Sequence, residues 1–219
     1  IFLSSGTWSL VGFESDKPVL GAAAEKARVA NERTGDGGYR PLTNVVGLFL
    51  LEQIMADFKQ RPQSDREWAT LISAAQKLPV SKDLLDLTDR AFTSPASMKA
   101  AIDAQLRKRK LNVPKTLAAY TRLICDSIGE GHAKCIRAFE GMTNKIFKRI
   151  LIVGGGSKNQ LLCQATADAT GLPVISFSLE GTAVGNMARQ LIALKAVKDL
   201  KTFRRLLSAD LKQKTYRPN

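Results

Sequence analysis

The chain has 219 residues, of which 44% are hydrophobic and 24% charged, ordinary proportions for a globular protein with a substantial core. No apolar run reaches the roughly 18 residues that a membrane-spanning helix needs. The three cysteines form no CxxC pair, so neither a zinc site nor a disulfide framework is indicated, and a cytoplasmic location is expected. The net charge is +13, but the basic residues are dispersed and not interleaved with aromatics, which favours a solvated surface over a nucleic-acid site.

The chain begins with Ile1, inside an apolar run that is typical of a β-strand. Natural proteins seldom begin in the middle of a strand. We therefore expect the chain to be part of a longer protein, in which case its positive charge could also be one half of a charge asymmetry.

The first quarter of the chain is expected to form strands followed by a helix. Residues 1–14 predict a β-hairpin that turns at Gly6 and Thr7. An Ala-rich connector, a short strand and a glycine-rich loop are expected next, at residues 16–27, 28–32 and 34–38. Asn44 is interpreted as the N-cap of a helix whose apolar stripe includes Gly47 and ends at Phe58.

The middle of the chain is predicted to be helical. Helices are expected over residues 64–78 and 97–109, separated by an irregular stretch between Pro79 and Pro95. A long helix begins near Pro114, a residue suited to a first helical turn.

The last third predicts alternating strands and helices: an apolar strand at 149–153, a helix at 159–169, a strand at 173–177 and two helices beyond Gly181. Together with the hairpin, this order implies an α/β protein with a mixed sheet and helices on both faces.

The strongest chemical signal is RILIVGGGSKNQLL, in which a buried strand runs into Gly154, Gly155 and Gly156 and then a helix. Glycines let a ligand approach the backbone, and a helix start offers free N–H groups, so nucleotide or phosphate is favoured. Neither a Walker A motif nor GxGxxG is matched, because no GK[ST] follows and Asn159 takes the last glycine's place. Tight helix–strand packing explains a triple glycine about as often as a ligand site does.

Other candidate residues carry weaker signals. Ser4 to Trp8 could hold a terminal phosphate, although a plain hairpin turn is the commoner explanation. His132 falls on an apolar helical stripe, which favours a core histidine over a catalytic one. Glu180 lies between a strand and a helix and is not assigned a catalytic role.

Four collinear segments resemble the C-terminal domain of the FGGY family of carbohydrate kinases. They are SSGTWSLVGFE (4–14), NERTGDGGYRPLTNVVGLFLLEQ (31–53), IVGGGSKNQLLCQATADATGLPVI (152–175) and EGTAVGNMARQL (180–191). The resemblance implies a ribonuclease H-like, actin-like ATPase fold. It also implies that residues 1–219 form one nucleotide-binding domain with a helical insertion around 60–112, partnered by an N-terminal sugar-binding domain that this chain lacks.

The same resemblance implies a transferase that moves the γ-phosphoryl group of ATP, carried with Mg²⁺, to a primary hydroxyl of a sugar. Gly6 and Thr7 would contact the nucleotide phosphates, Gly154 to Gly156 would line the nucleotide site, and Asn159 would reach the base. Asn44 matches a residue near the sugar. A kinase for another ketose or pentulose, and a stand-alone basic binding module, remain as alternatives.

The chain departs from the family pattern at three places. The family's catalytic aspartate lies just upstream of the position of Ile1, so the resemblance assigns no general base to this chain, and no metal ligand is assigned either. Glu52 stands where relatives carry a nucleotide-contacting Gln, and its charge would repel phosphates unless a cation or an Arg intervenes. Arg33 and Thr34 replace a Gly-Gly pair in the loop on the sugar side.

Overall fold

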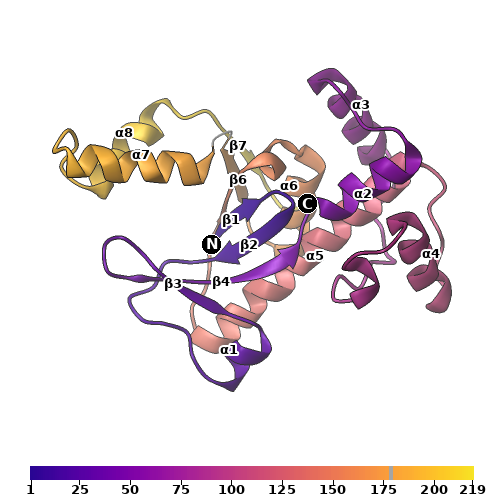
Figure 1. Ribbon diagram of the computed structural model, residues 1–219, viewed down its shortest axis with the longest axis horizontal. Coiled ribbons are helices and arrows are strands. Elements are labelled where there is room, and N and C mark those ends of the chain that lie inside the picture. Colours follow the sequence, from indigo (N-terminus) through magenta and orange to yellow (C-terminus); the bar gives the residue numbers. More distant parts are fainter. Residues whose placement is uncertain (178–179) are drawn as a thin grey trace.

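The computed structural model describes residues 1–177 and 180–219, and these residues contain one mixed β-sheet of seven strands. The strand order is β3-β4-β2-β1-β5-β6-β7 (Figure 1). The strands are β1 (Phe2–Ser5), β2 (Trp8–Gly12), β3 (Ala30–Arg33), β4 (Tyr39–Val46), β5 (Ile150–Val153), β6 (Val174–Phe177) and β7 (Gln213–Tyr216). The α-helices are α1 (Ala22–Lys26), α2 (Phe49–Phe58), α3 (Asp65–Gln76), α4 (Met98–Lys108), α5 (Leu117–Thr143), α6 (Gln160–Thr170), α7 (Gly181–Ala193) and α8 (Leu200–Asp210).

Strand direction brings two chain turns to one edge of the sheet. β5 pairs in parallel with both β1 and β6, whereas β2 pairs antiparallel with β1 and β4. The C-terminal ends of β1, β5 and β6 therefore meet at the same edge. The segments that follow β1 and β5 are the hairpin turn and the glycine-rich turn.

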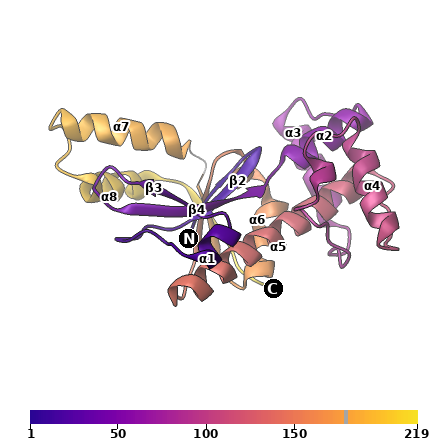
Figure 2. The same cartoon turned by 60° about the horizontal axis from the view of Figure 1, so that its bottom comes forward.

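Helices lie on both faces of the sheet. Alternation along the strands places Leu3, Val11 and Ile152 on one face, where they share a core cluster with Ile136 and Phe139 of α5. Helix α6 packs beside α5 on this face. Figure 2 shows α7 on the side of the sheet away from α5, and α8 packs against α7.

Residues 59–116 form a helical region that packs on α2 and α5 and has its own apolar cluster (Figure 1). The irregular stretch between α3 and α4 is held by hydrogen bonds to side chains of α4 and α5. The Ser127 hydroxyl accepts the Leu85 N–H at 2.9 Å, and Gln105 Oε1 accepts the Asp86 N–H at 2.9 Å. These bonds satisfy backbone groups that no helix or strand ladder satisfies.

The sequence prediction for Asn44 as a helix N-cap is wrong. Asn44 lies inside β4, opposite Leu10 of β2, and α2 begins only at Phe49. The burial pattern gives the reason, because Thr43 and Val45 are buried while Asn44 between them is exposed. Strands β4 and β7 and the short helix α1 were not predicted. The hairpin, β5, β6 and the helices from α3 onward match the predicted elements within a few residues.

Among the described residues, no helix is both long and apolar enough to cross a membrane.

Candidate functional site

The glycine-rich turn after β5 is shaped by a close approach to the end of β1. Gly154 has φ +83°, and a Cβ there would lie 2.7 Å from the Ser5 carbonyl oxygen. A Cβ on Gly156 would lie 2.1 Å from Ser5 Oγ. By contrast, a Cβ on Gly155 would meet no heavy atom of the described residues within 4 Å. Packing therefore demands the two outer glycines, whereas the middle one faces open space.

The carbonyl oxygens of this turn accept bonds from the residues that follow it. Gly154 O accepts the Ser157 N–H at 3.0 Å, and Gly156 O accepts the Asn159 N–H at 3.1 Å. Asn159 is 9% exposed, and its Oδ1 caps α6 by accepting the Leu162 N–H at 3.1 Å. Its Nδ2 points to Cys125 Sγ at 3.7 Å. The Asn159 amide thus has its partners inside the protein and fixes the start of α6.

The hairpin turn between β1 and β2 is joined to the start of α2. Gly6 O accepts the Leu48 N–H at 2.9 Å, and Thr7 O accepts the Phe49 N–H at 3.1 Å. A Cβ on Gly47 would lie 2.7 Å from Gly6 O, so only glycine allows this approach. Thr7 is exposed, and the space around Gly6 is open. The approach of Gly47 was missed by the sequence reasoning, which placed this residue inside a helix.

Three backbone segments therefore meet around the end of β1: the hairpin turn 6–7, the start of α2 at 47–49, and the glycine turn 154–156. We refer to them together as the three-segment site. Thr7 supplies an exposed hydroxyl, and Gly155 supplies backbone without a side chain. Such an arrangement suits a phosphate-bearing ligand, which takes hydrogen bonds from backbone N–H groups and hydroxyls.

Glu52 lies in the first turn of α2, and its carboxylate is paired with a cation. Arg61 Nη2 lies 3.0 Å from Glu52 Oε2, with the two side chains 63% and 38% exposed. Arg61 therefore offsets the charge of Glu52, and a neighbouring Arg is the condition under which the sequence analysis allowed phosphates near this carboxylate. Sequence reasoning did not single out Arg61, because nothing in its spacing from Glu52 predicts a contact across the end of α2.

The two residues expected on the sugar side lie in the β3–β4 part of the sheet. Asn44 is exposed on β4, which leads directly into Gly47. Arg33 ends β3, and its guanidinium stacks over the Tyr39 ring with 4.6 Å between the guanidinium carbon and the ring centroid. No direct contact between either residue and the glycine turn is seen among the described residues.

Several buried polar groups are structural. His132 is fully buried between α5 and α6, with Nδ1 3.0 Å from Thr166 Oγ1, and burial lowers its pKa to about 3. This confirms the prediction of a core histidine. Burial likewise raises the pKa of both Cys125 and Cys163 to about 12, so neither thiol is a ready nucleophile.

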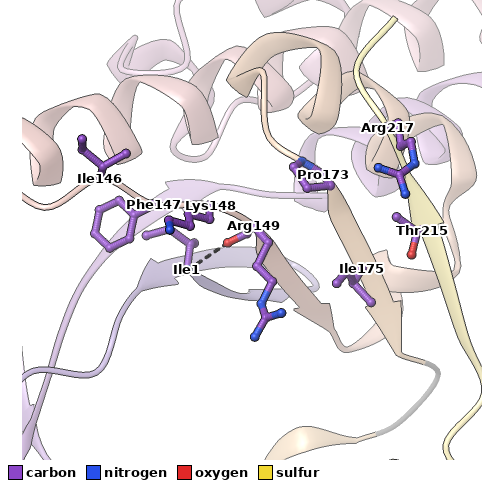
Figure 3. Close-up of a pocket in the computed structure, with 9 residues that line it drawn as sticks. All are labelled: Ile1, Ile146, Phe147, Lys148, Arg149, Pro173, Ile175, Thr215 and Arg217. Carbon is purple, nitrogen blue, oxygen red and sulfur yellow. Dashed lines mark hydrogen bonds between the residues drawn. The ribbon is translucent and has the colours of Figure 1, made fainter.

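The pocket in Figure 3 lies at the opposite end of the strands. Its lining includes Ile1, Arg149 and Pro173, which directly precede β1, β5 and β6. The Ile1 amine donates to Arg149 O at 3.0 Å there. A second pocket lies between residues 15–20 and the end of α5. Neither pocket contains a residue of the three-segment site. The site is formed by chain turns and lies in neither of these two pockets.

Within residues 1–177 and 180–219, no group of three His, Cys, Asp or Glu side chains is placed to hold a metal ion.

The fold has counterparts among known proteins. The solved structures of xylulose kinase from Rhodospirillum rubrum and gluconate kinase from Lactobacillus acidophilus are similar to the whole chain, with TM-scores of 0.70 and 0.69 at 16% and 15% identity. The chain covers 42% of each of those chains. Glycerol kinase from Plasmodium falciparum, solved with ADP, has a TM-score of 0.69 at 10% identity, and the chain covers 42% of it. This likeness confirms the ribonuclease H-like, actin-like ATPase fold.

A family model described as "FGGY family of carbohydrate kinases, C-terminal domain" matches residues 1–194. The chain therefore belongs to the FGGY family of carbohydrate kinases, as the sequence motifs predicted. Among curated proteins it is similar to the rhamnulokinases of two Klebsiella pneumoniae strains, with 36% identity over 218 residues. That alignment covers 100% of this chain but 44% of each relative, so the chain spans under half the length of the proteins it resembles.

Proposed function

We propose that this chain is the nucleotide-binding half of a kinase that phosphorylates L-rhamnulose with ATP, giving L-rhamnulose 1-phosphate and ADP. The observation that carries the proposal is the meeting of the exposed Thr7 turn, the start of α2 and the open face of Gly155 at one sheet edge. The 36% identity to rhamnulokinases along the whole chain supports this substrate over other ketoses and pentuloses.

Thr7 and the open backbone at Gly6 and Gly155 would hold the phosphate chain of ATP. The N–H groups of Gly155 and Gly156 would donate to the phosphate oxygens. Backbone donors need no rearrangement when charge develops on the transferred group, which is how most catalysis of phosphoryl transfer arises.

Asn159 would act by holding α6 and the glycine turn, since its amide is occupied within the protein. Glu52, paired with Arg61, would face the nucleotide as a neutralised ion pair. Asn44, exposed on β4, would lie toward the sugar.

In the proposed reaction the primary hydroxyl oxygen of the sugar bonds to the γ-phosphorus, and the bond from that phosphorus to the β,γ-bridging oxygen breaks. ADP leaves, and the hydroxyl proton passes to a general base. We place that base, an aspartate, in a segment upstream of Ile1, and a sugar-binding domain with it. Residues 1–219 would then form one domain, with the helical region around 60–112 as an insertion and ATP, Mg²⁺ and the sugar as ligands.

A coupled ADP-release assay tests the proposal. The 219-residue chain alone is expected to bind ATP in a calorimetric titration but to release no ADP with L-rhamnulose, because the proposed base lies upstream of Ile1. The chain joined to its upstream segment is expected to turn over L-rhamnulose faster than D-xylulose. Turnover by the chain alone, or a preference for D-xylulose, would contradict the proposal.

A further inference from the structure

We infer that Ser157 is a positioning residue for ATP, whose hydroxyl holds the glycine turn in the shape that presents Gly155 to the ligand. The inference rests on the proposed function and extends it to a residue that does not itself face the open space. Ser157 is 5% exposed and directly follows the three glycines.

The Ser157 hydroxyl joins two chain segments that are far apart in sequence. Its Oγ lies 2.7 Å from Gly154 O, at the start of the turn, and 3.0 Å from Phe177 O, at the C-terminal end of β6. One hydroxyl proton is shared between the two carbonyl oxygens. The turn after β5 is thereby tied to the end of the neighbouring strand, in addition to the bond from the Ser157 N–H to Gly154 O.

This tie matters because glycine has little conformational preference of its own. Three consecutive glycines can adopt many backbone shapes, and each one fixed on ligand binding costs conformational entropy. The outer two glycines are constrained on one side by Ser5, which their Cβ positions would overlap. Ser157 constrains the turn from the other side. A turn fixed from both sides before ATP arrives binds it more tightly than one that must be ordered by it.

The directions of the turn's carbonyl groups also support a positioning role for Ser157. Gly154 O points to Ser157, while Gly156 O accepts from Asn159 and lies 3.8 Å from Cys163 Sγ. The carbonyls of Gly154 and Gly156 are thus directed into the protein, and the other polar groups of the turn include the N–H groups of Gly155 and Gly156. Loss of the Ser157 hydroxyl would leave Gly154 O with the Ser157 N–H bond alone and would remove the tie to Phe177 O, so the peptide between Gly154 and Gly155 would be held less firmly.

The test compares Ser157→Ala with a matched control, Ser127→Ala. Ser127 is also buried, and its hydroxyl donates to Leu123 O at 2.7 Å and accepts the Leu85 N–H, but it lies in α5 and supports the helical region instead of the glycine turn. Calorimetric titration with Mg·ATP gives the dissociation constant, and amide hydrogen exchange at Ser157 and Asn159 reports on the turn. Thermal unfolding confirms that each variant folds.

S157A is expected to raise the dissociation constant for ATP about tenfold, equivalent to about 1.4 kcal/mol, and to speed exchange at both amides. S127A is expected to lower the unfolding temperature without changing either readout. S157T, which keeps the hydroxyl, is expected to recover most of the affinity. A folded S157A protein with wild-type ATP affinity, or with wild-type exchange at Ser157 and Asn159, overturns the inference. A wild-type chain that fails to bind ATP overturns the proposed function instead, and the exchange rates then still decide whether Ser157 holds the turn.

Discussion

Arg61 pairs with Glu52 across the end of α2, with 3.0 Å between Arg61 Nη2 and Glu52 Oε2. The pair places a compensating cation beside the one carboxylate that sequence reasoning expected to repel a nucleotide. Both side chains are substantially exposed, so their mutual attraction adds little to stability. The main effect of the pair is therefore on the local charge around Glu52.

Removing one charge of this pair should change ATP affinity in a predictable direction. Arg61→Ala leaves Glu52 unbalanced and is expected to weaken ATP binding about threefold, within the ~1 kcal/mol typical of exposed pairs. Glu52→Gln leaves the guanidinium free and is expected to strengthen binding by a similar factor. The double variant should bind as the wild type does, and calorimetry at low and high salt should show the single-variant effects shrinking with salt. Equal affinities for all four proteins at low salt would show that the pair lies too far from the nucleotide to matter.

The outer glycines of the turn should be far less tolerant of substitution than the middle one. Gly156→Ala puts a methyl group 2.1 Å from Ser5 Oγ and is expected to destabilise the fold by about 1–3 kcal/mol in urea unfolding. Adding Ser5→Gly removes the obstructing side chain and should restore part of this loss. Gly155→Ala is expected to leave unfolding unchanged. Comparable destabilisation by alanine at 155 and 156 would be inconsistent with the described packing.

Acid should destabilise the protein through His132, its only histidine. Burial lowers the folded-state pKa to about 3 from 6.5, so below pH 6.5 the unfolded chain binds a proton that the folded chain does not. Stability contributed by neutral His132 is present above pH 6.5 and falls with decreasing pH, at a rate approaching about 1.4 kcal/mol per pH unit. Urea unfolding between about pH 7 and pH 5 measures this slope, and His132→Gln should flatten it. A slope that His132→Gln leaves unchanged would assign the acid sensitivity to other groups.

The helical region should be loosened by losing Gln105. This side chain accepts the Asp86 N–H at 2.9 Å and donates to Asp86 O at 3.1 Å and to Asp89 Oδ2 at 2.8 Å. Gln105→Ala leaves these groups unpaired and should cost about 1–3 kcal/mol of stability. Limited proteolysis should then cut faster between residues 79 and 95, while ATP affinity stays at the wild-type value. Unaltered cleavage would mean that other contacts suffice to hold the segment.

Sequence reasoning succeeded where the signal is local. The strand before Gly154, the helix capped by Asn159 and the helix capped by Ser64 follow from apolar runs, glycines and capping residues. It failed for β4, because Asn44, a residue type common at helix starts, was taken as an N-cap although it lies within the strand. It missed β7, whose Gln213–Tyr216 segment is mostly polar and joins the sheet edge through its pairing with β6.

For the site, the sequence identified the residue types but not how they meet. Gly6, Thr7 and the triple glycine were singled out, yet their meeting at Ser5 depends on the pairing of β1 with β5, about 150 residues away in the chain. The approach of Gly47 to the hairpin turn, the Arg61–Glu52 pair and the double contact of Ser157 are likewise long-range. They arise from tertiary packing, which periodicity and spacing do not encode.

The most direct measurement of the central claim is a calorimetric titration of Mg·ATP into the wild-type chain and into Gly155→Val. Because the space around Gly155 is open, the valine should leave folding intact and project into the nucleotide site. Saturable binding of one ATP per wild-type chain, abolished in a G155V protein with an unchanged unfolding temperature, is the predicted result. Absence of ATP binding by the folded wild-type chain, or equal binding by both proteins, would contradict the account.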